Sequence, residues 1–253
     1  MSVIPFRFLD TLPELPQPSG NWHDNLWVSD ESTTAQTYRE FIAAAGETGI
    51  WPVVIPDDFR FARPAEDWIV DRGRLPSAVE DVGAIRALDV FEAWWDPPPD
   101  YDRRFRPFGP DFPGLTRRSP KRTKPFEEAA WAGGMLANSP GSRLGLVRAG
   151  RPADIPAAIG WAGMIAMTDR VAALSAVLRS WEDRFGAVLV ELGFDSLAFS
   201  VAAPPTTLKR GIAVAAEHRA FAPASFGRYL EQWTVQAYAE GILGSHFWRF
   251  TWV

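Results

Sequence analysis

The clearest pattern of hydrophobic and polar positions runs from Thr168 to Ala203. Bulky apolar residues recur there at spacings of three and four, which places them on one face of a helix, and these are Val171, Leu174, Leu178, Trp181 and Phe185. Polar side chains at 179, 180, 182 and 183 fall mostly on the other face, as expected of a solvated surface. After Gly186 the period changes to two over residues 187–192, and again over 197–201. The stretch therefore predicts a helix over 169–185 that lies on a β-hairpin.

Weaker patterns predict further elements on both sides of this stretch. Residues 1–25 are predicted to be irregular, and we expect strands over 26–28, 50–55, 144–147 and 246–252. We expect helices over 34–46, 77–95 with a break near Gly83, 125–137, 153–160, 207–219 and 235–243. The first helix is predicted to end at Gly46, and a capping box is predicted to begin the second at Ser77 and Glu80. The fold class that follows is α+β (mixed α/β), with a central sheet covered by helices and a βαβ region near the N-terminus.

Composition suggests two parts of the chain. Residues 1–140 form an N-terminal α/β region, and residues 141–253 form a C-terminal α+β domain that carries the helix and hairpin. The predicted boundary falls at Asn138–Gly141, where polar and turn-forming residues follow a helix. Residues 96–125 are rich in proline and basic residues, and long segments of this kind are usually functional or linker-like.

Composition and charge exclude several classes of function. The 253 residues include no cysteine, which excludes disulfides, thiolate metal sites and cysteine nucleophiles, and three scattered histidines predict no metal site and no cofactor. A net charge of −5 argues against general nucleic-acid binding. We see no signal peptide and no membrane span, so the expected location is the cytoplasm. The 12 tryptophans favour an aromatic core, with an aromatic partner surface as the alternative.

The basic loop is the strongest candidate for a binding surface. Residues 100–124 carry eight Lys and Arg against three Asp. The candidate binding residues are Arg103, Arg104, Arg106, Arg117, Arg118, Lys121 and Arg122. Such arginines grip carboxylate or phosphate groups, and the phenylalanines at 105, 108 and 112 offer stacking surfaces. The alternative is a solvated connector, because runs of charge usually face solvent.

The chain contains none of the common catalytic motifs. There is no nucleophile elbow, Walker loop, dinucleotide fingerprint, zinc-protease motif or EF-hand loop. The nearest candidates for catalysis are His218 with Glu217, and Glu191 if it lies close in space. A histidine oriented by a carboxylate acts as a general base. The alternative for His218 is a partly buried structural side chain with one satisfied hydrogen bond.

Several strings resemble a known family. They are LWVSDE at 26–31, FGPDFPGL at 108–115, RLGLV at 143–147, ALSAVLRSWEDRFGA at 173–187, AEHRAF at 216–221 and AYAEGILGSHFWRFTW at 237–252. Together they resemble the bacterial domain-of-unknown-function family four-two-five-three, most closely over 143–253. The resemblance implies a soluble bacterial protein and carries no activity with it. Where the family pattern has Cys-Pro-Asp-Asn and a terminal Trp-Trp-Asp, this chain has 222–225 as Ala-Pro-Ala-Ser and 251–253 as Thr-Trp-Val, so it lacks a thiol and two carboxylates.

These observations lead to one functional prediction and two alternatives. The prediction is a non-enzymatic module that binds another protein, in regulation or in neutralising a toxin. One alternative is a small-molecule hydrolase that uses His218 with a carboxylate. The other is nucleotide or nucleic-acid contact through residues 103–124. The partner and the oligomeric state are left open by the sequence.

Overall fold

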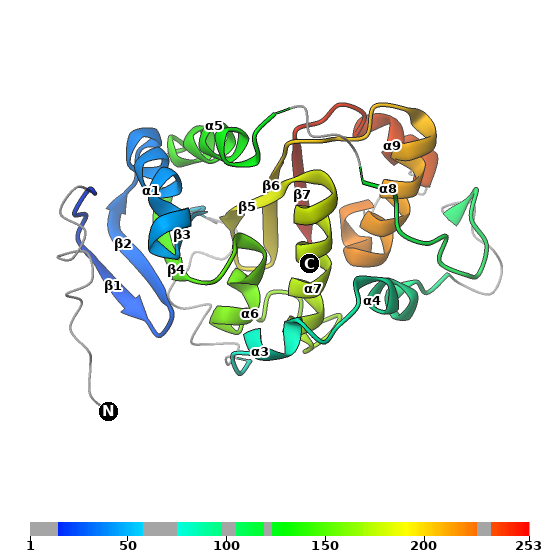
Figure 1. Cartoon of the computed structure of the whole chain (residues 1–253), viewed down its shortest axis with the longest axis horizontal. Coiled ribbons are helices and arrows are strands. Elements are labelled where there is room, and N and C mark those ends of the chain that lie inside the picture. Colours follow the sequence, from blue (N-terminus) through cyan, green and yellow to red (C-terminus); the bar gives the residue numbers. More distant parts are fainter. Residues whose placement is uncertain (1–14, 58–74, 98–104, 119–122, 227–233, 253) are drawn as a thin grey trace.

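A seven-stranded sheet runs through the protein in the order β1-β2-β4-β3-β5-β6-β7 (Figure 1). The computed structural model describes residues 15–57, 75–97, 105–118, 123–226 and 234–252. The strands are β1 (Gly20–His23), β2 (Leu26–Ser32), β3 (Ile50–Ile55), β4 (Arg143–Arg148), β5 (Ala187–Leu192), β6 (Ser196–Val201) and β7 (Phe247–Thr251). Only β3 and β5 pair in parallel, and all other neighbours are antiparallel, so the sheet is mixed. The expected α+β class is confirmed.

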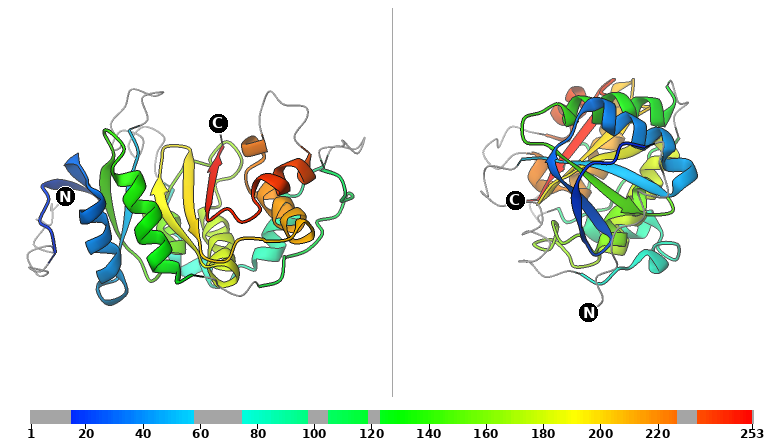
Figure 2. Two further views of the ribbon diagram at one scale, coloured as in Figure 1. Left: turned by 90° about the horizontal axis from the view of Figure 1, so that it is seen from above. Right: turned by 90° about the vertical axis from the view of Figure 1, so that its left-hand side faces the viewer.

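Helices cover both faces of this sheet. They are α1 (Ala35–Thr48), α3 (Val79–Val82), α4 (Ala87–Trp94), α5 (Pro125–Ala137), α6 (Ile155–Ile159), α7 (Val171–Phe185), α8 (Leu208–Phe221) and α9 (Val235–Gly241). Helices α1 and α5 lie on one face, and α3, α6 and α7 lie on the other (Figure 2). Helices α8 and α9 lie at the end of the sheet beside β7. The helices therefore shield both faces of the central strands from solvent, which agrees with the complete burial of β3, β5 and β6.

The expected βαβ region has a split form. Strand β4 lies between β2 and β3 and is antiparallel to both, so β2 and β3 run parallel without touching. Because β4 comes from beyond residue 140, one continuous sheet joins the two predicted parts of the chain. The division into two domains stays a prediction. Strand β3 is central in the sheet, so Pro52 removes one ladder donor at an interior position.

The predicted helix and hairpin are confirmed. Helix α7 ends at Gly186, which has φ 62° and donates its N–H to Trp181 and Glu182 carbonyls, a left-handed cap. The helix begins two residues later than expected, with Arg170 at the N-cap position and no side-chain cap. The Thr168 hydroxyl instead accepts from the Arg170 N–H at 3.1 Å. The hairpin register shifts between Leu189 and Glu191, a β-bulge that the alternation of residues did not reveal.

Three local predictions are wrong. Helix α1 continues through Gly46 and ends at Gly49, which has φ 69°. Helix α3 has Ala78 at its N-cap position and no side-chain cap bond, so the capping box predicted at Ser77 and Glu80 does not form. The residues before β2, expected to be irregular, include the short strand β1. The predicted break near Gly83 is confirmed, because α3 and α4 are separate helices.

Aromatic side chains fill the interior, as the tryptophan count predicts. Seven of the described tryptophans are buried, and they are Trp27, Trp51, Trp95, Trp161, Trp181, Trp248 and Trp252. Trp181 of α7 lies at the centre, with its ring 4.6 Å from that of Phe221 and 5.3 Å from that of Phe250. On the other face, α5 approaches α1 so closely that a Cβ at Gly133 would lie 2.1 Å from the Tyr38 ring. Glycine at this position permits the two helices to pack.

Candidate functional site

An open cleft of about 530 Å³ lies between α7 and the segment that joins α3 to α4. Its apolar side chains come mainly from the α3–α4 segment and from the loop before α5, and they are Val82, Ile85, Ala87, Leu88, Leu115 and Ala176. Its charged and polar side chains are Arg86, Arg151, Arg179, Ser180, Asp183 and Arg184. The lining thus combines an apolar surface with four arginines and one carboxylate, a combination typical of ligand sites with few, fixed polar groups.

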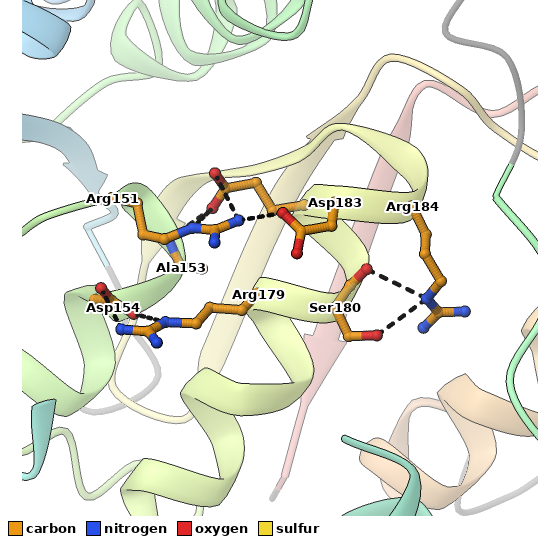
Figure 3. Close-up of polar contacts among 8 residues, drawn as sticks. Arg151, Ala153, Asp154, Arg179, Ser180, Asp183 and Arg184 are labelled. Carbon is orange, nitrogen blue, oxygen red and sulfur yellow. Dashed lines mark hydrogen bonds and ion pairs between the residues drawn. The ribbon is translucent and has the colours of Figure 1, made fainter. Parts of the chain in front are cut away.

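Arg179 is held in the cleft from behind by a buried carboxylate. Its Nε and Nη2 donate to the two oxygens of Asp154 at 2.6 and 2.9 Å (Figure 3). The Asp154 side chain is only 4% exposed, whereas that of Arg179 is 27% exposed. A guanidinium has five N–H donors in a fixed fork, so this pair leaves the Nη1 group of Arg179 available. The group is fixed in place before any ligand arrives.

Arg151 closes one side of the cleft through two carboxylates of α7. Its Nη2 donates to Asp183 at 2.6 Å, and its Nε donates to Glu182 at 3.2 Å (Figure 3). Glu182 also accepts from the Ala153 N–H at 3.3 Å, which ties the turn before α6 to α7. Burial raises the pKa of Glu182, and the bonds from Arg151 oppose that rise. This group is a structural clamp with a charged outer surface.

Arg184 belongs to a more deeply buried pair. Its Nη1 and Nη2 donate to the two oxygens of Glu217 at 2.8 and 2.6 Å, and the Glu217 side chain is fully buried. Glu217 also accepts from the Trp181 indole N–H and from the Thr116 N–H, each at 2.8 Å. Arg184 in turn donates to the Thr116 carbonyl at 2.9 Å. Glu217 therefore fastens the basic loop to α7 and α8, and all four donors to it are protein groups.

Arg86 is the most accessible cation of the cleft. Its side chain is 73% exposed, and its ion pair with Asp89 spans 3.4 Å. Arg86 is also the N-cap residue of α4 and makes no side-chain cap bond, so the first N–H groups of that helix lack this partner. Its guanidinium and these N–H groups both favour an anion at this end of the cleft.

His218 lies in an aromatic cage outside the cleft. It is fully buried, and its ring stands nearly perpendicular to those of Trp248, Phe250 and Trp181 at 4.5, 4.8 and 5.1 Å. Its Nδ1 lies 3.2 Å from the Tyr238 hydroxyl, and no described group bonds its Nε2. Burial, and after it the positive charge of Arg184, lowers the pKa of His218 to about 3. The imidazole is neutral at pH 7.

The structure does not bring the three candidate catalytic residues together. Glu191 pairs in register with Ala198, which pairs with Arg249, whereas Trp248 and Phe250 alternate with Arg249 and face His218. Glu191 therefore lies on the opposite face of the sheet, where it accepts from Arg249 at 2.8 Å. Glu217 neighbours His218 in sequence but bonds Arg184. No polar site combines the three side chains.

The structure describes part of the predicted binding loop. Arg106, Arg117 and Arg118 are exposed, whereas Arg103, Arg104, Lys121 and Arg122 lie outside the described residues. The phenylalanines of the loop pack inward on α4, with Phe112 stacked on Phe91 at 5.3 Å and Phe105 against Trp95 at 5.1 Å. These two rings are consequently occupied within the fold. The loop meets the cleft at Leu115, two residues before the exposed Arg117.

Sequence reasoning missed the arginines of the cleft itself. Arg179 and Asp183 were assigned to a solvated face of α7, and Arg86 and Arg151 were not singled out. The available signal was weak: 176, 179, 180 and 183 form a stripe beside the apolar face of α7. The other wall comes from residues 82–88 and Leu115, and no spacing in the sequence joins these segments.

In the five described ranges, no three His, Asp or Glu side chains gather closely enough to hold a metal ion. None of the helices in those ranges is both long and apolar enough to cross a membrane.

The sheet and cleft define a mixed α+β protein with an open, arginine-lined groove beside α7. Residues 143–252 match the model of a family described as a domain of unknown function, DUF4253, which is the family that the sequence resembles. The match includes β4 and every later element, so α7 with its arginines lies inside it. The opposite wall of the cleft lies outside it. No curated protein and no solved structure matches the chain.

Proposed function

We propose that the protein is a non-enzymatic module that binds another protein, of a regulatory or toxin-neutralising type, through the cleft beside α7 and the adjoining loop. The observation that carries the proposal is the convergence of four arginines and several apolar side chains on one open cleft. Arg117 and Arg118 add two exposed arginines on the loop just beyond Leu115. Protein interfaces favour arginine and apolar groups in their central parts.

The polar groups of the interior support a binding role over catalysis. A general base must reach a substrate and titrate near the working pH. His218 is fully buried with a pKa lowered to about 3, and Glu217 accepts four hydrogen bonds from the protein. Both side chains are used to hold the fold.

The distribution of charge supports a selective partner. The chain carries a net charge of −5, yet the described part of the loop, 105–118, exposes Arg106, Arg117 and Arg118 against one exposed carboxylate, Asp111. A basic patch on an acidic body attracts an acidic surface of a partner and repels basic ones. The proposed partner is a protein with an acidic, partly apolar surface.

The experiment compares capture by four proteins. The wild type, Arg86→Glu, the double variant Arg117→Glu with Arg118→Glu, and Arg39→Glu are immobilised at equal density and exposed to lysate of the source organism. Arg39 is exposed on α1, on the other face of the sheet, so its variant is a control for a reversal of charge. Mass spectrometry identifies captured proteins, and a purified candidate is then titrated by calorimetry.

We expect one protein to bind the wild type and Arg39→Glu equally, and both other variants at least about tenfold more weakly, since each reverses charge in the interface. Equal binding by all four proteins would place the interface elsewhere and contradict the proposal. A captured compound that is chemically converted would instead favour an enzyme.

A further inference from the structure

We infer that the cleft beside α7 binds a single carboxylate of the partner together with an apolar side chain next to it. This inference rests on the proposed function and specifies the chemistry of its site. The ligand is an acidic side chain in a partner segment, with a neighbouring hydrophobic residue that enters the same cleft.

The apolar half of the cleft fits the hydrophobic residue. Ile85, Leu88 and Leu115 are only partly buried and line the cleft from two separate segments. Covering such surface is worth about 25 cal/mol for each Å² removed from water. A ligand without an apolar group would leave this lining exposed.

The polar half of the cleft fits a carboxylate. The Nη1 group of Arg179 is the part of its fork that Asp154 does not use, and it lies 3.8 Å from the position of a Cβ at Gly83. Arg86 lies in the same lining, with one long ion pair and a side chain that is 73% exposed. Ser180 accepts from the Nε of Arg184 at 3.0 Å, so its own hydroxyl hydrogen is available to a ligand.

The surrounding charges favour one negative charge over two. Each cleft arginine already has a carboxylate partner: Asp89, Asp154, Asp183 or Glu217. Asp89 and Asp183 are 56% and 54% exposed. The site therefore offers N–H donors with little surplus positive charge. A phosphate group carries nearly two charges and would meet more repulsion than a carboxylate does.

Gly83 allows a matched pair of test variants. It has φ −65° and ψ −23°, which any residue adopts, and an added Cβ would meet only Arg179 Nη1, at an ordinary contact distance. Gly83→Asp places a carboxylate beside that group and blocks the site from within. Gly83→Asn has the same shape without the charge.

The probes are 4-phenylbutyrate, its uncharged analogue 4-phenylbutyramide, and phenyl phosphate. Each is titrated into the ¹⁵N-labelled full chain while amide and arginine Nε–H signals are followed by NMR. We expect saturable shifts centred on Ala176, Arg179 and Ser180 with the carboxylate. The amide should bind at least about fivefold more weakly, since it loses a charge-assisted hydrogen bond.

The variants then locate the site. Gly83→Asp should weaken the binding of 4-phenylbutyrate at least about tenfold, and Arg86→Gln at least about threefold, whereas Gly83→Asn and Arg39→Gln should stay within about twofold. Circular dichroism of every variant verifies that it is folded.

Four results would overturn the inference: no saturable binding, equal binding of carboxylate and amide, equal affinity of Gly83→Asp and Gly83→Asn, or tighter binding of phenyl phosphate than of the carboxylate. The inference and the proposed function can fail separately. Partner capture that depends on Arg86 without carboxylate binding would sink only the inference. Carboxylate binding as expected, with capture unaffected by Arg86→Glu, would sink only the proposed function.

Discussion

Two adjacent residues of α8 show how the same depth of burial acts on different chemistry. Glu217 and His218 are both fully buried. Glu217 accepts two hydrogen bonds from Arg184 and two more from the Trp181 indole and the Thr116 N–H, because an unpaired buried carboxylate is very costly. His218 has an aromatic cage and one hydroxyl partner, and burial favours its neutral form. Substitution of either side chain should therefore change the free energy of unfolding.

His218 should make the protein less stable in acid. Its pKa is about 3 in the folded protein and about 6.5 in the unfolded chain, so below pH 6.5 only the unfolded state takes up the proton. Relative to His218→Phe, the wild type should lose about 1.4 kcal/mol of unfolding free energy per pH unit between pH 6 and pH 4. Urea unfolding at several pH values measures this. His246→Gln, at a side chain that is 35% exposed, is the control. If the free energy of unfolding varied with pH in the same way for the wild type and His218→Phe, His218 would not be held neutral by its aromatic cage.

Glu217→Gln should destabilise the protein by about 3 kcal/mol, because it leaves the Arg184 guanidinium, 12% exposed, without its counter-charge. Combining Glu217→Leu with Arg184→Leu should cost less than the sum of the two single changes. Asp89→Asn, in an exposed ion pair, should cost less than about 1 kcal/mol. Denaturant unfolding at pH 7 provides all of these values. If the double variant were destabilised by the sum of the two single variants, Glu217 and Arg184 would not be energetically coupled.

At the scale of elements, two glycines of α1 have opposite roles. Gly46 lies inside the helix with nothing within 4 Å of an added Cβ, so Gly46→Ala should stabilise the protein by about 0.5–1 kcal/mol. Gly49 ends the helix at φ 69°, so Gly49→Ala should destabilise it by about 1 kcal/mol. Thermal unfolding measures both. Destabilisation by Gly46→Ala would contradict this and would indicate that the helix ends at Gly46, as the sequence pattern predicted.

The edge strand β7 is closed at both ends by serine hydroxyls. Ser225 accepts from the Thr251 N–H at 3.0 Å, and Ser245 donates to the Phe247 carbonyl at 2.7 Å. Unpaired edges promote association with other chains, and these bonds occupy backbone groups on that edge. Within the described residues, β7 is thus a poor site for strand addition, which agrees with placing the partner at the cleft.

Sequence patterns predicted the elements whose environment is set by neighbours in the chain. Helix α7 and its hairpin follow from residues within one short stretch, because one face of each meets the core. The sequence offered a partly buried structural side chain as one interpretation of His218 on α8. Side chains of α7, β7 and α9 in fact surround it, so helical period alone does not report its burial. The cleft could not be predicted, since tertiary packing alone brings Arg86 to Arg179.

For the whole molecule, the pairing of β4 decides whether the part of the chain that matches DUF4253 can fold alone. Strand β4 lies inside 143–252, but both strands that pair with it, β2 and β3, come from before residue 143. Strand β3 also separates β4 from β5, the nearest strand of the matched part. A fragment of residues 141–253 would also lose α5, which lies over β5 and β6. The apolar residues of β4 and the covered face of β5 would then be exposed to water.

We therefore expect fragment 141–253 to lack a cooperative unfolding transition, although it contains every residue of the DUF4253 match. Circular dichroism with heating, and the dispersion of its NMR spectrum, test this against the full chain. Adding residues 1–140 as a separate polypeptide should restore the transition, since β2 and β3 would pair with β4 again. A fragment that unfolds cooperatively by itself would show that residues 141–253 are an independent domain and that β4 needs no partner from the first half of the chain.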